Sequence, residues 1–241
     1  MKKSMLTDKI FQIENHFFGE GDEFVFGVDE AGRGPLVGPV VAATVMISKE
    51  CIVRIDESLK NGDFDENIFD FVRDSKKLTE KKRNEIYDFI VNNFYVGIGV
   101  CDHDTVDRIN ILQASFLSMK KAIVDLRGKL KKSKGNDFFI EGKSIILVDG
   151  NKTIPNLSGK QKAFVQGDKN VKLISAASIV AKVTRDRMLH EMHERYPQYG
   201  FDRHKGYGTK VHIEALKKHG PCEFHRKSFG PVKRYLKGIM E

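Results

Sequence analysis

Two adjacent carboxylates, Asp29 and Glu30, stand between an apolar run and a loop rich in glycine. The runs on either side of them, residues 24–28 and 40–47, are rich in β-branched and aromatic side chains, which favours two strands joined by the loop. Glycines let backbone amides approach a ligand closely, and Arg33 offers a planar fork of donors that suits phosphate. Carboxylates repel a polyanion unless a cation intervenes, so this pattern points to a divalent metal ion beside a phosphate-binding loop.

The loop differs from two better-known phosphate-binding patterns. A dinucleotide fingerprint, G-x-G-x-x-G, would need its third glycine at Val37, but the glycine stands one position later, at Gly38. A P-loop would need Gly-Lys-Ser/Thr at this point of the chain. A plain hairpin with an acidic turn is the remaining alternative. The other residues of the chain decide between this hairpin and a metal site.

Two further carboxylates follow short apolar runs. Asp149 comes directly after residues 144–148, and Asp168 follows a second short strand expected over residues 163–166. Open α/β sheets place their sites at the carboxyl ends of strands, although an aspartate before or after a glycine is also common in turns. The repetition of the pattern favours a site.

Together these acids predict an all-oxygen site. No histidine or cysteine accompanies them at ligand spacing, and oxygen donors suit Mg²⁺ or Mn²⁺ better than zinc. The residues alone therefore indicate a metal-dependent nuclease or phosphoryl-transfer enzyme. One geometric question stays open, because neighbours on a regular strand point to opposite faces. Asp29 and Glu30 converge only if the strand ends or kinks there.

The overall composition limits which kinds of partner and which cellular compartment fit the protein. The 241 residues carry a net charge of +8 with 33 acidic residues interspersed, which favours a polyanion partner. The chain has three cysteines, Cys51, Cys101 and Cys222, which lie too far apart for a zinc knuckle. Their odd number and wide spacing fit a protein of a reduced compartment. No apolar run reaches membrane-spanning length, and the first 20 residues lack a signal-peptide core. We expect a cytoplasmic protein with no membrane partner.

The remaining elements are expected as follows. Residues 1–20 form a helix or loose arm, 50–73 an irregular surface excursion, 94–101 a strand, and 129–136 a basic loop. Helices are expected over residues 80–92 (capped by Thr79), 105–127 (capped by Thr105), 174–195 and 210–219. Just before the first of these, Ser75, Lys76 and Lys77 form either a phosphate contact or a solvated basic turn.

The helix over residues 174–195 also carries a polar stripe: Ser178, Lys182, Arg185 and Asp186. Asp186, flanked by arginines, is expected to be an ion-pair partner rather than a metal ligand. His190 and His193 do not have the spacing of a zinc-protease motif. Tyr207, between two glycines and near basic residues, is an exposed aromatic suited to stacking on a sugar or base.

Five stretches of the sequence resemble, in order along the chain, the motifs of ribonuclease HII, the bacterial type 2 ribonuclease H. They are GVDEAGRGPLVGPVV, DSKKLTEKKR, LVDGN, SAASIVAKVTRDR and YGFDRHKGYGT, and they cover most of residues 24–209. The resemblance implies an α/β RNase H-like fold, a central mixed five-stranded sheet flanked by helices, with a C-terminal helical portion. We accordingly divide the chain into an arm (1–20), a catalytic domain (21–200) and a helical portion packed on it (201–241).

The resemblance also implies an activity. Ribonuclease HII hydrolyses RNA in RNA–DNA hybrids and incises 5′ to a single ribonucleotide in duplex DNA, in replication and ribonucleotide excision repair. By position, its four catalytic and metal-binding acids fall on Asp29, Glu30, Asp149 and Asp168. Asp168 is chosen over Asp186 because the fourth acid of the family precedes the SAASIVAKV helix.

The substrate contacts are carried over in the same way. Gly32, Arg33 and Gly34 match the loop that reads the 2′-OH and its adjoining phosphate, and Tyr207 matches the tyrosine that stacks on the sugar at the RNA-to-DNA junction. The 2′-OH is the group that separates RNA from DNA at one site. Positioning contacts are expected from Ser75, Lys76, Lys77, Lys182 and Arg185.

The departures from the family are modest. Residues 50–73 and 129–142 are long and are expected to be surface insertions. The C-terminus has no convincing sliding-clamp motif, and we expect a monomer. The related ribonuclease HIII has an extra N-terminal domain, for which the residues before Phe24 leave no room. Two other classes stay open: a different metal-dependent nuclease on this fold, such as a Holliday-junction resolvase, and a non-catalytic nucleic-acid-binding module.

Overall fold

Five strands form one mixed sheet in the order β3-β2-β1-β4-β5. The computed structural model describes residues 7–63, 67–69, 78–134 and 142–236. The strands are β1 (Phe24–Ala31), β2 (Val40–Ser48), β3 (Tyr95–Cys101), β4 (Ser144–Asp149) and β5 (Lys160–Phe164). β2 pairs antiparallel with β1 and β3, whereas β4 pairs parallel with β1 and β5. The expected mixed five-stranded sheet is confirmed.

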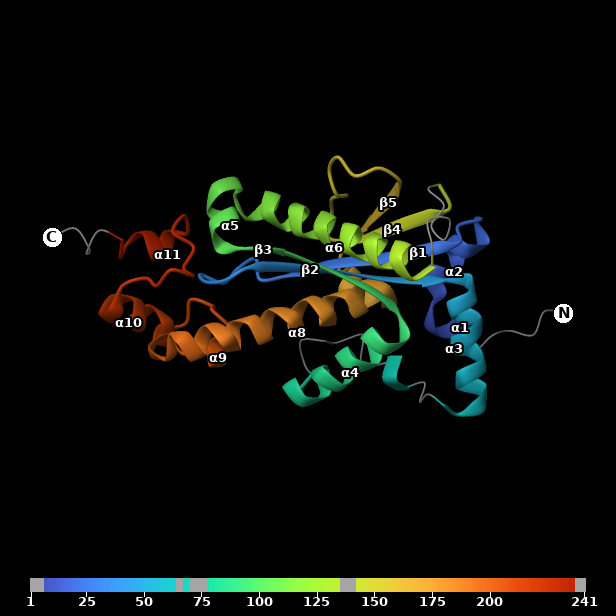
Figure 1. Ribbon diagram of the computed structural model, residues 1–241, viewed down its shortest axis with the longest axis horizontal. Helices are drawn as coiled ribbons and strands as arrows, with labels where there is room; N and C mark the ends of the chain where they lie inside the picture. Colours follow the sequence, from blue (N-terminus) through green and yellow to red (C-terminus); the bar gives the residue numbers. More distant parts are fainter. Residues whose placement is uncertain (1–6, 64–66, 70–77, 135–141, 237–241) are drawn as a thin grey trace.

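Two long helices cover the two faces of the sheet (Figure 1), α6 (Ile111–Lys134) on one side and α8 (Lys172–Arg195) on the other. The alternation of β1 decides which side chain meets which helix. Phe24, Phe26 and Val28 pack in one cluster with side chains of α6, whereas Val25 packs in another with the start of α8. The same alternation continues into the acidic pair that follows.

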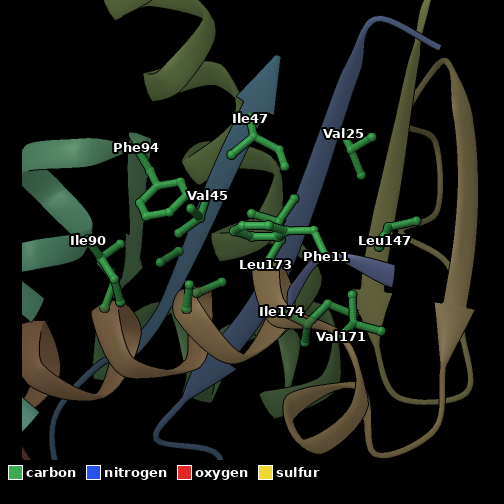
Figure 2. Packing of buried hydrophobic residues seen from close by; sticks show 14 of the residues in the cluster. Phe11, Val25, Val45, Ile47, Ile90, Phe94, Leu147, Val171, Leu173 and Ile174 are labelled. Atoms are coloured by element: carbon green, nitrogen blue, oxygen red, sulfur yellow. The ribbon is translucent and has the colours of Figure 1, made fainter. Parts of the chain in front are cut away.

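The core on the α8 side is drawn from segments far apart in the sequence (Figure 2). Phe11 and Phe94 lie among Val45 and Ile47 of the sheet and Leu173 of α8. The N-terminal helices α1 (Thr7–Ile10) and α2 (Gln12–Gly19) therefore pack on the domain. The buried carboxylate of Glu14 also accepts a hydrogen bond from the backbone N–H of Leu173 (2.9 Å), and so caps the start of α8.

Gly27 marks a close approach of β1 and α8. A Cβ atom at this position would lie 2.2 Å from the backbone carbonyl carbon of Leu173 and 2.4 Å from the backbone nitrogen of Ile174. We expect Gly27→Ala to lower the free energy of unfolding by about 3 kcal/mol, because the new methyl group would collide with backbone atoms of α8 and could fit only if β1 or α8 moved. Chemical denaturation measures this cost.

The matched control is Gly128→Ala, within α6, where a Cβ would meet nothing within 4 Å. It should stabilise the fold by about 0.5–1 kcal/mol, since alanine is the better helix former. A Gly27→Ala protein as stable as the wild type would contradict the close approach.

Three expectations from the sequence are wrong. Residues 49–61 form a helix, α3 (Lys49–Asn61), rather than an irregular excursion, because Ile52 and Ile55 are buried and the Ser48 side chain caps it. The helix expected from Thr105 is two helices, α5 (His103–Ile109), capped by Asp102, and α6, separated by Asn110 at φ +66°. The second runs on to Lys134, where a basic loop was expected, because Leu130 is buried against the sheet.

Other elements lie close to their expected positions. Helix α4 (Glu80–Asn93) is capped by Thr79 as predicted, and α10 (Lys210–His219) matches its expected bounds. The last strand, β5, lies three residues earlier than expected, so Asp168 falls in a short helix, α7 (Gly167–Asn170). In the described part of the chain, no helix is both long enough and apolar enough to cross a membrane.

The C-terminal elements pack against the loop between β1 and β2. They are a 3₁₀ turn (Pro197–Tyr199), α9 (Phe201–His204), α10 and α11 (Gly230–Lys233), and Figure 1 shows them gathered at the end of the molecule opposite the N-terminal helices. Leu36 and Val37 of the loop share a buried cluster with Tyr199, Phe201 and Leu216. The glycine-rich loop is thus supported by residues more than 160 positions later in the chain.

Candidate active site

Asp29 and Asp149 stand side by side at the carboxyl ends of two neighbouring parallel strands. Val28 of β1 pairs with Val148 of β4, so the next residue of each strand is the aspartate. Both aspartates occupy positions whose alternate neighbours, Val25 and Leu147, face α8. The sheet itself therefore brings these two carboxylates together.

Glu30 belongs to the other face of the sheet. Strand β1 continues past Asp29 to Ala31 with regular pairing to β2, so it neither ends nor kinks at the acidic pair. Glu30 stands at the end of the sheet and lines two cavities, of about 410 and 310 Å³. The first also contains side chains of α8, the second side chains of α6 and Asp149. Glu30 thus joins the acidic group from the edge between the two faces.

Asp168 is brought to the site by a backbone contact. Its N–H donates to Oδ1 of Asp149 (3.3 Å), so α7 begins directly over the end of β4. Gly167 permits this approach, because a Cβ there would lie 3.1 Å from the same oxygen. Asp168 was expected at a strand end, and it instead occupies the first turn of the helix that follows.

The electrostatics show that these acids form one group. Burial and the charges of Glu30 and Asp149 raise the pKa of Asp29 well above its ordinary value, against a hydrogen bond from Ser178. Burial also raises the pKa of Glu30, where Arg33 opposes and Asp149 assists the shift. The pKa of Asp149 is raised by burial and by the charge of Asp168. Buried carboxylates that raise one another's pKa in this way favour a bound cation, which would offset their mutual repulsion.

The donor set fits a divalent cation that prefers oxygen. Among the described residues, no three or more His, Cys, Asp or Glu side chains are assembled into a finished metal cage. Mg²⁺ does not require one, since it usually keeps several waters and is bound by one or two carboxylates together with substrate phosphates. The structural observation that supports this fit is the juxtaposition of Asp29 and Asp149 at the ends of β1 and β4, with the N–H of Asp168 on the Asp149 carboxylate and Asp29 buried.

The Gly-Arg-Gly loop and Tyr207 line the larger cavity together with Glu30. A Cβ on Gly34 would lie 3.4 Å from the ring of Tyr207, so the loop and the ring face each other. Tyr207 is 50% exposed. Gly32 adopts φ +98°, where a side chain would be strained and would collide with Arg185. Arg33 pairs with Glu30 (3.2 Å) while remaining half exposed.

The two predicted basic contacts on α8 differ from each other. Lys182 lines the larger cavity and pairs with Asp186 (2.5 Å), and burial lowers its pKa. Arg185 is 1% exposed, and its guanidinium donates to the backbone carbonyls of Val37, Pro39 and Lys205, each at 3.0 Å. Arg185 also lines this cavity, but three of its five N–H donors hold the loop, so its predicted contact with the substrate stays a prediction and its observed role is to support the loop.

Asp186 is an ion-pair partner, as expected, but of Lys182 and Arg83 (3.7 Å) rather than of its sequence neighbours. Its pairing to these cations sets it apart from the acidic group. Ser75, Lys76 and Lys77 lie outside the described residues.

Sequence reasoning missed three kinds of contributor. Ser178 was seen only as part of a polar stripe, yet it hydrogen-bonds Asp29. Asn151 and Lys152 line the smaller cavity beside Asp149 and follow the LVDG motif directly, which could have indicated them. Arg226, in the C-terminal part of the chain, donates hydrogen bonds to the carbonyls of Gly32 and Arg33 in the glycine-rich loop. Nothing in the sequence distinguishes it from its basic neighbours.

Comparisons with protein families and with known sequences identify the same family. The family model described as Ribonuclease HII matches residues 26–232. Ribonuclease HII from Fusobacterium nucleatum is 45% identical over 226 residues, covering 93% of this chain and 94% of the relative. Ribonuclease HII from Caldicellulosiruptor bescii is 44% identical over 223 residues, covering 92% and 94%.

Solved structures agree in fold. The ribonuclease H2 from Pyrococcus horikoshii superposes with a TM-score of 0.64 at 24% identity, covering 90% of this chain and 99% of that one. RNase HII from Archaeoglobus fulgidus, solved in complex with PCNA, gives 0.60 at 25% identity, covering 84% and 93%. Bst-RNase HIII in complex with Mn²⁺ gives 0.66 at 16% identity, covering 93% and 72%.

Proposed function

The chain belongs to the ribonuclease HII family, and on that premise we propose that it incises duplex DNA 5′ to a single embedded ribonucleotide by two-metal-ion hydrolysis with Mg²⁺ or Mn²⁺. As a type 2 ribonuclease H it is an endoribonuclease that acts on RNA in RNA–DNA hybrids. The proposal adds the finer substrate, the metal ions and the residues that serve them.

One observation carries the proposal: a single cavity holds both an acid of the acidic group and the elements that suit recognition of a ribose. Glu30, Gly34 and Tyr207 line it together. Loop amides and the Arg33 guanidinium are donors for a 2′-OH and a phosphate, and the exposed Tyr207 ring is a stacking surface. A 2′-OH read beside the acids places the RNA-specific contact next to the reacting phosphate.

Asp29, Glu30, Asp149 and Asp168 would hold the metal ions. When bound, such ions supply an activated water and stabilise the leaving oxygen of an in-line displacement. The protein's own residues prepare the site. Ser178 hydrogen-bonds Asp29, and the N–H of Asp168 fixes the Asp149 carboxylate (3.3 Å). Lys182, in the same cavity as Glu30, offers positive charge to the substrate backbone.

The proposal is tested with three labelled duplexes of the same sequence: a long RNA–DNA hybrid, a DNA duplex with one ribonucleotide, and an all-DNA duplex. In Mg²⁺ or Mn²⁺ we expect cleavage of the first two and none of the third, and EDTA should stop all cleavage. Cleavage of the hybrid alone would overturn the ribonucleotide-incision proposal. Cleavage of the all-DNA duplex would indicate a different nuclease, and binding without cleavage would indicate a binding module.

A further inference from the structure

Arg226 holds the Gly-Arg-Gly loop from beneath. Its side chain is 0% exposed, and its guanidinium donates to four backbone carbonyls, those of Gly32 (2.7 Å), Arg33 (3.1 Å), Pro35 (2.8 Å) and Gly38 (3.0 Å). A five-donor fork in fixed geometry is needed to serve so many acceptors at once, which lysine cannot do.

These contacts decide which way the loop amides point. In a planar trans peptide the C=O and the following N–H point in opposite directions. The Pro35 carbonyl turns toward Arg226, and accordingly the next N–H, that of Leu36, donates to the carbonyl of Gly206 on the Tyr207 side (2.8 Å). By the same geometry, the carbonyls held at Gly32 and Arg33 direct the next two N–H groups away from Arg226 and toward the outer side of the loop.

His225 supports the other half of the cavity through a chain of hydrogen bonds. The Cys222 N–H donates to Nδ1 of His225 (2.9 Å), so the proton of that ring lies on Nε2. Nε2 of His225 then donates to Nε2 of His212 (3.0 Å), and Nδ1 of His212 donates to the Tyr207 carbonyl (2.9 Å). Burial lowers the pKa of His212 to about 4 and that of His225 to about 3, so both rings are neutral at neutral pH.

The two supports share one backbone segment. The N–H of Arg226 donates to the Leu36 carbonyl (2.9 Å), and the N–H of Gly38 donates to the Phe224 carbonyl (2.9 Å). His225 forms a β-bridge with Val37. From this fixed backbone, two consecutive side chains diverge, one to the Gly-Arg-Gly loop and one toward Tyr207.

We propose that His225 and Arg226 are positioning residues for recognition of the ribonucleotide: Arg226 sets the Gly-Arg-Gly loop, and His225, acting through His212, sets Tyr207. The inference rests on the proposed function, since it assigns the cavity of Gly34 and Tyr207 to the ribonucleotide. It goes further in locating the determinant of that selectivity in a buried C-terminal pair that touches neither the substrate nor the acids.

A fluorescence test examines the positioning without any substrate. The chain contains no tryptophan, so Tyr207→Trp introduces a single tryptophan at the exposed ring position, and its emission can be excited at wavelengths where the remaining tyrosines do not absorb. In this background, His225→Phe should increase quenching by acrylamide and lower the emission anisotropy. His225→Gln, which can still donate from its amide nitrogen to His212, should restore most of the wild-type values. Equal values in all three proteins would overturn the His225 part of the inference.

The activity test compares two substrates in otherwise wild-type protein. For Arg226→Lys and His225→Phe, we expect kcat/KM on the single-ribonucleotide duplex to fall about tenfold more than on the long hybrid. In the hybrid every RNA residue presents a 2′-OH, so a displaced loop can be offset by a shift of register. His225→Gln should recover most of the loss. An unchanged ratio of the two activities, whether both stay the same or both fall equally, would overturn the proposal.

Leu130→Ala is the control for simple destabilisation, because Leu130 is buried on the α6 side of the sheet and belongs to a separate cluster. It should lower Tm without altering the substrate ratio. If Arg226→Lys does not fold, Arg226→Gln, which keeps two amide N–H donors, takes its place for the Arg226 part, and the His225→Phe and His225→Gln pair decides the His225 part. If the wild type leaves the single-ribonucleotide duplex intact, the proposed function fails, while the tryptophan measurement still decides the positioning.

Discussion

Asp29→Asn is expected to lower the rate of hybrid cleavage by about a thousandfold or more, because it removes a central charge of the acidic group while keeping its shape. Asp29 is buried between β1 and α8, within the electrostatic influence of Glu30 and Asp149. Single-turnover cleavage of the labelled hybrid in saturating Mg²⁺ measures the effect. A variant with near-wild-type activity would remove Asp29 from the catalytic group.

The same substitution should stabilise the fold in EDTA. Burial and neighbouring charges raise the pKa of Asp29 in the folded protein, so the folded state binds more protons than the unfolded chain. Stability then falls as pH rises between the unfolded and folded pKa values. Asparagine escapes this penalty, so Asp29→Asn should have a higher Tm than wild type near about pH 8 and little advantage near about pH 4. Adding Mg²⁺ should raise Tm more in the wild type than in the variant.

The control is Asp56→Asn, at another buried carboxylate, which accepts from the N–H of Thr7 and pairs with Lys60. It lies on α3, away from the acidic group. This change should leave cleavage unaffected and lower Tm, since it removes an ion pair. A stability gain from both substitutions would show that the gain at Asp29 has nothing to do with a metal site.

Tyr207→Ala is expected to reduce cleavage at a single ribonucleotide by about 10- to 100-fold, since loss of one stacking contact costs about 1–3 kcal/mol. Binding to the all-DNA duplex should change much less, because backbone contacts by basic residues dominate it. Tyr207→Phe keeps the ring and should retain most of the activity. Cleavage kinetics and duplex binding at one fixed salt concentration provide the two readouts.

Equal losses of cleavage and of duplex binding in Tyr207→Ala would refute the stacking role. Arg195→Lys is the surface control, because Arg195 is exposed and pairs with Glu223 at a distance from the cavity. It should leave both readouts unchanged.

The elements that carry the acids could be predicted from the sequence because their signals are local. The apolar runs that form β1 and β4 directly precede Asp29 and Asp149, and strand pairing then places the two aspartates side by side. The cap at Thr79 and the helix over residues 210–219 were predictable for the same reason. Here each local signal agreed with the tertiary packing.

What could not be predicted depends on contacts between distant segments. Local periodicity cannot show that Ile52 and Ile55 of α3 are buried or that Leu130 extends α6. Arg185 stands in a polar stripe, but its side chain is buried beneath a loop almost 150 residues earlier in the chain. The support by Arg226 spans a still longer separation. Such arginines look like surface charges until the carbonyls that they hold are known.

The most direct test of the whole account is the position and chemistry of the nick in a duplex with one ribonucleotide, cut by the wild type in Mg²⁺. We expect one nick on the 5′ side of the ribonucleotide, with a 3′-hydroxyl on the DNA and a 5′-phosphate on the ribonucleotide, because the attacking group is water. A nick on the 3′ side that leaves a 2′,3′-cyclic phosphate would mean that the 2′-OH is the nucleophile. That result would contradict both the hydrolytic role of the acids and the recognition role of the cavity.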